Sequence, residues 1–378
     1  MKILLTGGGT GGHLIPLLSV IAEIKKRDAQ AEFLFVGPKS DFNDTLREAG
    51  IEVKIITAGK FRRYFSLQNF SDIFKVLMGI DQAFFYILKF KPDVIFSKGG
   101  FASVPAVFAA SYTRIPILTH ESDTVPGLAN KLIGHFAKKI FISFPESRKY
   151  FPDKKIIVSG NPIREDILEG DKNRAQRFFG LREDLPIILV FGGSQGAQKI
   201  NEALFDSLPK LLADFQVIHI CGTKNVEEIE KKMDGLELAN KKRYKVYPYL
   251  KDEMKDAFAL SDFIISRAGA NSLSEIIALD KPSLIIPLPS AANNHQYHNA
   301  EYFAEQNMIL LSEEKDLDEG KLLKKLKEVQ NRKDEITENL ERYNDSLSGK
   351  RPAEVIAEGV LKMGKNNPLS RSNIRVIL

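Results

Sequence analysis

The sequence predicts an α/β protein of two domains, each built on a parallel sheet with helices on both faces. The chain has 378 residues, and at a loose prior of about 150 residues per domain this length suggests two domains, each able to bury its own core. Short apolar runs alternate with helical stretches, and the alternation repeats in the second half. Hydrophobic residues make up 43% of the chain and charged residues 27%, which argues against disorder or a fibrous repeat.

Both halves show this alternation. Helical apolar spacing occurs at 14–26 and 42–49, and the short apolar runs of the first half, expected to be strands, are 2–6, 32–36, 53–57, 93–97 and 116–120. The turn Gly160-Asn161-Pro162 interrupts the pattern. It restarts with a helix at 200–212 and expected strands at 187–191, 217–221, 244–246, 263–266 and 283–287. Such alternation is typical of βαβ units and parallel sheets.

These segments predict two Rossmann-like domains, 1–163 and 164–349. Alternating charge with helical apolar spacing at 313–347 predicts one or two amphipathic helices in the second domain. A last helix at about 350–363 is expected to pack back on the first domain, and the tail 364–378 shows no clear pattern.

Composition narrows the function classes. Cys221 is the only cysteine, which excludes an intramolecular disulfide and a cysteine-cluster metal site and suits a reducing compartment. We expect no signal peptide, because the opening residues 1–6 run straight into glycines, and no membrane span, because no apolar run approaches roughly 18 residues. The net charge of +5 is concentrated in 54–91, where seven basic and two acidic residues are interleaved with aromatic side chains. Such a segment can indicate nucleic-acid binding, but no recognised nucleic-acid module is present.

Two glycine-rich loops each follow an expected strand and precede a helix. The first, Gly7-Gly8-Gly9-Thr10-Gly11-Gly12-His13, would point backbone amides at a phosphate. It contains Gly-x-Gly-x-x-Gly, but the second strand ends in Phe35-Val36-Gly37-Pro38, without the carboxylate that a nicotinamide dinucleotide site requires. The second loop, 192–196, is not a Walker motif because no Gly-Lys-Ser/Thr follows. Two such loops facing across a cleft would suit a nucleotide diphosphate.

The segment 267–275 allows two interpretations. Ser272-x-x-Glu275 has the spacing of a capping box, in which Glu275 would bond a backbone amide at the helix start. The small residues before it also leave room for a ligand, and a carboxylate in the first helical turn could accept hydrogen bonds from both hydroxyls of a ribose. The spacing alone does not choose between them.

Six motifs, in order over residues 3–360, resemble the MurG family of glycosyltransferases. They are 8–13 (GGTGGH), 120–131 (HESD, PGLANK), 160–164 (GNPIR), 192–197 (GGSQGA), 272–275 (SLSE) and 294–300 (NHQ, NA). The resemblance implies a GT-B fold, with two parallel sheets facing across a cleft, and no cofactor or metal. It implies inverting transfer of N-acetylglucosamine from UDP-N-acetylglucosamine (UDP-GlcNAc) to the C4 hydroxyl of N-acetylmuramic acid (MurNAc) in undecaprenyl-pyrophosphoryl-MurNAc-pentapeptide (lipid I). The product would be lipid II, the peptidoglycan precursor.

The resemblance also implies the donor contacts. From the sugar end to the uracil they are Thr10, Gly11, Gly12, Asp123, Gln296, Arg164, Ser194, Leu250, Ala270, Asn271, Ser272, Leu273, Ser274 and Glu275. Glu275 would bind the ribose hydroxyls, which favours the second interpretation of its segment. Asp123 stands where some family members carry Asn, and a carboxylate can accept from a sugar hydroxyl but cannot donate to it.

An inverting transfer needs a base for the acceptor hydroxyl. We expect His13 in this role, because imidazole titrates in a suitable range and His13 follows the first glycine loop. Asp123 is the alternative base. The other interpretation of His13 is a helix-start histidine bonded to a neighbouring carbonyl. Loop amides, helix dipoles and Arg164 would stabilise the departing UDP.

A lipid acceptor would account for the basic, aromatic segment. Its membrane contacts would be Phe84, Phe85, Ile87, Leu88, Lys89 and Lys91, with apolar side chains in the headgroup region and bases on anionic lipid. Alternatively, the aromatics form the domain core and the bases solvate it. The expected location is the cytoplasmic face of a bacterial membrane, peripherally bound, in contact with a cell-wall synthesis complex. Competing functions are transfer to another lipid acceptor, epimerisation of a UDP-sugar, or a non-catalytic sugar-nucleotide-binding scaffold at the membrane.

Overall fold

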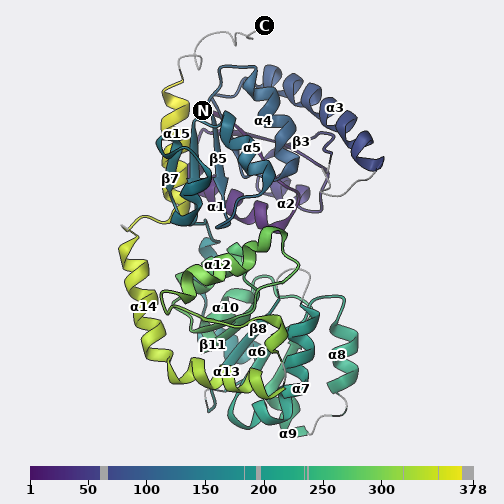
Figure 1. Ribbon diagram of the computed structural model, residues 1–378, viewed down its shortest axis with the longest axis vertical. Coiled ribbons are helices and arrows are strands. Elements are labelled where there is room, and N and C mark those ends of the chain that lie inside the picture. The colour runs from purple at the N-terminus through teal and green to yellow at the C-terminus, as the bar shows by residue number, and fades with distance from the viewer. Residues whose placement is uncertain are drawn as a thin grey trace. The chain divides into compact units, whose positions relative to one another are not determined.

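The chain folds into two compact units (Figure 1). This computed structural model describes residues 1–59, 67–182, 184–192, 197–233, 235, 238–317, 319–347 and 349–367. Unit 1 comprises Met1–Ile163 together with the chain from Lys350 onward, and unit 2 is Arg164–Gly349. Within the described ranges, no helix is long and apolar enough to cross a membrane.

Unit 1 is built on a seven-stranded parallel sheet of order β3-β2-β1-β4-β5-β6-β7. Its strands are β1 (Lys2–Thr6), β2 (Glu32–Gly37), β3 (Glu52–Ile55), β4 (Val94–Ser97), β5 (Ile117–Glu121), β6 (Lys139–Ile142) and β7 (Ile156–Val158). Ile3 lies opposite Phe33 on one side and Val94 on the other. The strand order reverses between β1 and β4, and ligands of open α/β sheets bind at the carboxyl ends of the strands beside such a reversal.

Helices cover both faces of this sheet. They are α1 (Gly11–Arg27), α2 (Asn43–Glu48) and α15 (Pro352–Lys365) on one face, and α3 (Leu67–Phe90), α4 (Val104–Ser111) and α5 (Leu128–Phe136) on the other. Because successive strand residues point to opposite faces, Ile3 and Leu5 join the α1 core while Leu4 joins the α4 core.

Helix α15 closes unit 1 by packing along α1. The carboxylate of Glu23 on α1 is almost fully buried, and Arg351, just before α15, places its Nη2 3.3 Å from Glu23 Oε1. Ile356 and Val360 of α15 are fully buried in the same core as α1. The chain therefore returns to unit 1 after completing unit 2.

Unit 2 repeats the plan with a six-stranded parallel sheet of order β10-β9-β8-β11-β12-β13. The strands are β8 (Ile187–Phe191), β9 (Gln216–Ile220), β10 (Tyr244–Tyr247), β11 (Phe263–Ser266), β12 (Ser283–Ile285) and β13 (Leu310–Leu311). The helices are α6 (Lys172–Phe179), α7 (Gln198–Asp214), α8 (Val226–Met233), α9 (Leu238–Arg243), α10 (Met254–Leu260), α11 (Ala270–Ala278), α12 (His295–Ala304), α13 (Glu319–Asn331) and α14 (Lys333–Ser346). The order reverses between β8 and β11. The predicted α/β class with two parallel-sheet units is confirmed.

Candidate active site

In unit 1, the candidate site lies at the carboxyl ends of β1, β4 and β5. The glycine loop follows β1, Lys98-Gly99-Gly100 follows β4, and Ser122-Asp123 follows β5. The amide of Gly8 donates to the carbonyl of Gly99 at 3.1 Å, which fixes the first two loops together. The site thus occupies the reversal in strand order where ligands bind in this kind of sheet.

The imidazole of His13 is packed against two glycines. A Cβ added to Gly8 would lie 2.6 Å from His13 Nδ1, and one added to Gly100, whose φ is +84°, would lie 3.0 Å from Nε2. Any side chain at Gly8 would displace the ring, and one at Gly100 would also be strained. The ring is hydrogen-bonded to the Thr10 hydroxyl, 3.0 Å from Nδ1, and not to a carbonyl as the alternative interpretation required.

His13 is held in its neutral form. Its pKa is lowered to about 4, mainly by burial and also by the charge of Lys98, while Asp123 opposes both, so the ring titrates below the range expected from the sequence. The ring is therefore uncharged at neutral pH. When Nδ1 carries the proton and donates to Thr10, Nε2 presents its lone pair, as a general base must.

Lys98 is a site residue that was not predicted. Its side chain is only 3% exposed and donates to the hydroxyl of Ser122. Burial lowers its pKa to about 8, while the carboxylates of Glu121 and Asp123 favour its charged form. A lysine directly after an apolar strand and before two glycines is the signal that could have found it.

Glu121 and Asn130 complete a buried network with Lys98. Asn130 Nδ2 donates to Glu121 Oε2 at 2.7 Å, and the Asp123 amide donates to Glu121 Oε1 at 2.9 Å. Asn130 Oδ1 accepts from the amide of Gly100 at 3.1 Å. Burial raises the pKa of Glu121 to about 7. The network joins the loops after β4 and β5 to α5, so it orients the backbone around His13.

In unit 2, Glu275 lies inside α11 and is paired with Arg164. The helix begins at Ala270 with Gly269 as its N-cap, so Ser272 is not a cap and the capping-box interpretation is wrong. Glu275 is buried, and Arg164 Nε lies 3.5 Å from its Oε1. Burial raises the pKa of Glu275 to about 7, and the Arg164 charge opposes the rise.

The other residues of unit 2 that were predicted to contact the donor differ in how accessible their side chains are to a ligand. Leu273 is fully buried in the core, so its predicted contact with the nucleotide is wrong for the side chain. The Ser274 hydroxyl donates to the Ala270 carbonyl at 2.8 Å within the helix. The Leu250 side chain is also buried, which leaves its main chain. Ser194 lies outside the described residues.

Two side chains hold the segment 286–288, which directly follows β12. Gln296 Oε1 accepts from the Leu288 amide at 3.0 Å, which leaves its carboxamide nitrogen as the donor for a ligand. Arg267, which was not predicted, is buried and donates to the carbonyls of Ile286 and Pro287 at 3.3 and 3.2 Å. Arg267 therefore supports the loop that holds Gln296.

The predicted membrane contacts on α3 require a correction. Ile87 is fully buried in the α4 side of the core, and Phe84 packs against that core, so Ile87 is wrong as a membrane contact. Phe85, Lys89 and Lys91 are exposed. The exposed apolar stripe of α3, as defined here, consists of Ile73, Phe74, Leu77, Met78 and Phe85. Lys60, Arg62 and Arg63 lie outside the described residues.

The chain matches two family models: the glycosyltransferase family 28 N-terminal domain over residues 3–142 and the C-terminal domain of the same family over residues 187–355. Among curated proteins, UDP-N-acetylglucosamine--N-acetylmuramyl-(pentapeptide) pyrophosphoryl-undecaprenol N-acetylglucosamine transferase 2 of Bacillus anthracis is 41% identical over 345 residues, 91% of this chain and 95% of the relative. The transferase of that name, without the number, from Clostridium perfringens is 40% identical over 348 residues, 92% of this chain and 93% of the relative.

Solved structures show the same fold. The crystal structure of Acinetobacter baumannii MurG matches with a TM-score of 0.73 at 24% identity, covering 96% of this chain and 99% of that one. A UDP-GlcNAc 2-epimerase from Neisseria meningitidis, bound to UDP-GlcNAc, matches with a TM-score of 0.65 at 15% identity, covering 97% of this chain and 100% of that one. The fold is thus shared with epimerases, whereas the 40% relatives are transferases. The chain therefore belongs to the MurG family, within glycosyltransferase family 28.

Proposed function

We propose that this protein transfers GlcNAc from UDP-GlcNAc to the C4 hydroxyl of MurNAc in lipid I, with inversion at the anomeric carbon. The names of the 40% identical relatives state the donor, the acceptor and the reaction. The observation in the structure that carries the proposal is the neutral imidazole of His13, held by Thr10, Gly8 and Gly100 at the reversal in strand order.

The reaction is a single displacement. His13 Nε2 takes the proton of the acceptor hydroxyl as its oxygen bonds to the anomeric carbon of GlcNAc. The bond between that carbon and the β-phosphate oxygen breaks, and UDP leaves with the electron pair. We assign the base to His13 and sugar binding to Asp123, because Asp123 lies in the Lys98 network whereas Nε2 of His13 faces the loop after β4.

Unit 2 binds the nucleotide in this proposal. Glu275, when ionised, accepts hydrogen bonds from the ribose hydroxyls, and Arg164 neutralises charge on the diphosphate. The N-terminal end of α11 follows β11 beside the reversal in strand order of unit 2, where its dipole also favours phosphate. Gln296 donates its carboxamide hydrogen to a GlcNAc hydroxyl. The departing UDP is thereby stabilised without movement of these groups.

The acceptor is proposed to be reached at a membrane surface. The apolar stripe of α3 is flanked by exposed Lys75 and Lys89. Lys75 Nζ lies 2.8 Å from Asp72 Oδ1, so Lys89 offers the less neutralised charge. An apolar stripe bordered by lysines suits the headgroup region of an anionic leaflet. Peripheral binding of unit 1 would bring its site to the lipid-linked acceptor.

The test is incubation of the full chain with radiolabelled UDP-GlcNAc and either lipid I or diacylglycerol in detergent. We expect label in a lipid-linked disaccharide only with lipid I, and none with the His13→Gln variant. Transfer to diacylglycerol, or release of UDP without transfer to lipid I, would overturn the proposal. Conversion of UDP-GlcNAc to its 2-epimer would identify the competing epimerase activity.

A further inference from the structure

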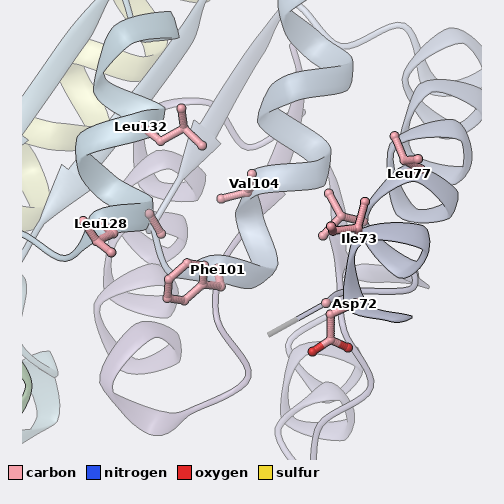
Figure 2. A pocket seen from close by; sticks show the side chains of 10 residues that line it. Asp72, Ile73, Leu77, Phe101, Val104, Leu128 and Leu132 are labelled. Atoms are coloured by element: carbon pink, nitrogen blue, oxygen red, sulfur yellow. The ribbon is translucent and has the colours of Figure 1, made fainter. Parts of the chain in front are cut away.

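Unit 1 contains an apolar pocket of about 340 Å³ between α3, α4 and α5. Figure 2 shows Leu128 and Leu132 on one side, Phe101 and Val104 in the middle, and Ile73 and Leu77 on the other side. Among the described residues that line it, Asp72 has the only polar side chain, and its carboxylate is paired with Lys75. The pocket walls are hydrocarbon and offer almost no hydrogen-bonding group.

Two walls of the pocket continue directly into the candidate active site. Phe101 starts the short helix η1 (Phe101–Ser103), one residue after Gly100, which packs against His13. Ala129 lines the pocket, and the next residue, Asn130, bonds both Glu121 and the Gly100 amide. The pocket wall and the candidate active site are therefore formed by adjacent residues on two separate segments.

We propose that this pocket binds the first isoprene units of the acceptor's polyprenyl chain, next to the pyrophosphate. The proposal rests on the proposed function, because it assumes that the acceptor sugar lies beside His13. An apolar cavity of about 150 Å³ holds benzene, so about 340 Å³ has room for roughly a dozen carbon atoms, or two to three isoprene units.

The apolar surface next to the pocket favours a long chain over a compact apolar ligand as the occupant. Ile73 and Leu77 line the pocket and also belong to the exposed stripe of α3. A chain that occupies the pocket can therefore leave it along the apolar surface of α3 without exposing its next units to water. The apolar lining stabilises such a chain by burial alone.

A cavity-filling variant tests the proposal. Val104→Phe fills the pocket, and Met78→Phe adds the same ring to the α3 stripe outside the pocket as the matched control. Each is assayed with two lipid I analogues, one with a farnesyl chain and one with a single isoprene unit. We expect Val104→Phe to lower kcat/KM for the farnesyl analogue roughly tenfold, through KM, and by a clearly smaller factor for the short analogue, which can place only one unit in the pocket. Met78→Phe should change neither.

Equal losses with both analogues, or no loss with either, would overturn the proposal. Inactivity of the wild type with every acceptor would instead contradict the proposed function. Binding can then still be tested with photoreactive farnesyl pyrophosphate and the wild-type chain. Labelled peptides from 72–77, 101–104 and 128–132, protected by unlabelled farnesyl pyrophosphate, would support the pocket. Labelling elsewhere, or protection only by phosphatidylglycerol vesicles, would show a different site or an acyl-chain site.

Discussion

Arg164 and Glu275, both expected to bind the donor, contact each other, with Arg164 Nε 3.5 Å from Glu275 Oε1. The distance is that of an ion pair and not of a well-formed hydrogen bond. Glu275 is buried, and burial raises its pKa to about 7. Near neutral pH, this carboxyl is therefore divided between a protonated form and the ionised form that can accept from both ribose hydroxyls.

UDP binding should consequently weaken in acid. Below pH 7 an increasing share of Glu275 is protonated, and its ionisation must precede binding, so the dissociation constant should rise about tenfold for each pH unit. Isothermal titration calorimetry with UDP between pH 5.5 and 8.5 measures this slope. The Glu275→Gln variant should bind more weakly at pH 8.5. In this variant, the pH dependence of the dissociation constant should reflect only the titration of UDP itself. Equal slopes for the two proteins would contradict the assignment.

His13→Gln should lower kcat by about 10²–10⁴-fold, the usual contribution of a general base, while KM for UDP-GlcNAc stays nearly unchanged. Burial and Lys98 lower the pKa of His13 to about 4. The ring is thus already neutral at pH 5.5, and its own titration should not reduce kcat there. The measurement is kcat at saturating donor and acceptor from pH 5 to 8.

The Asp123→Asn variant tests whether Asp123, and not His13, is the general base. An asparagine keeps the size of the side chain but removes its charge and its ability to accept a proton. We expect a loss in KM for the donor and a much smaller loss in kcat than with His13→Gln. A kcat loss as large as that of His13→Gln would move the base to Asp123.

Lys98→Met should destabilise unit 1, and more so at pH 8 than at pH 6. Glu121 has its pKa raised to about 7, and Lys98 is among the groups that lower it. The hydrogen bonds from the Asp123 amide and Asn130 lower this pKa more than Lys98 does, so without the cation the pKa of Glu121 rises further, and the carboxyl costs more free energy as pH rises above 7. We expect a larger loss in unfolding free energy at pH 8 than at pH 6.

Urea unfolding at both pH values measures these losses, with Lys138→Met, an exposed lysine of the same unit, as the control. The double variant Lys98→Met, Glu121→Gln should regain part of the stability at pH 8, because no carboxylate remains to be neutralised at position 121. A pH-independent loss, or no regain in the double variant, would show that Lys98 acts by packing alone.

The site could be predicted where a local pattern is enough to define it. The glycine loop and His13 are contiguous in sequence, and a strand followed by glycines and a helix places a ligand at that strand's carboxyl end. Lys98 escaped prediction because its importance depends on β4 lying beside β1, a neighbour relation set by the reversal in strand order. Arg267 escaped for a similar reason, since its partners follow β12.

The alternation of strands and helices was predictable, but not every element was, and the 24-residue helix α3 was not predicted. Strands β6, β7 and β13, of four, three and two residues, were not predicted either. In α3, apolar residues occupy nearly every position between Ala83 and Leu88. The pattern therefore did not reveal that Ala83 and Ile87, one turn apart, face the core while Phe85 is exposed.

The exposed stripe of α3 should control membrane binding. Phe74 is 65% exposed and Leu77 54% exposed, so replacing both with Ser removes apolar surface without opening the core. We expect the Phe74→Ser, Leu77→Ser variant to bind vesicles of phosphatidylglycerol and phosphatidylcholine at least tenfold more weakly in a sedimentation assay. Leu168→Ser, at a 45% exposed leucine of unit 2, is the control and should bind like the wild type.

Activity separates a docking role from a catalytic one in this last experiment. Transfer to a water-soluble acceptor without a polyprenyl chain should survive in the doubly substituted variant, because neither Phe74 nor Leu77 belongs to the His13 network and such an acceptor has no chain to reach Leu77 in the pocket. The rate of transfer to lipid I in vesicles should fall by about the same factor as vesicle binding. Salt should weaken the residual binding by screening Lys89 from anionic lipid, since the Debye length shrinks from about 10 Å at 0.1 M to about 3 Å at 1 M. Unchanged vesicle binding in the variant would show that the stripe does not contact the bilayer.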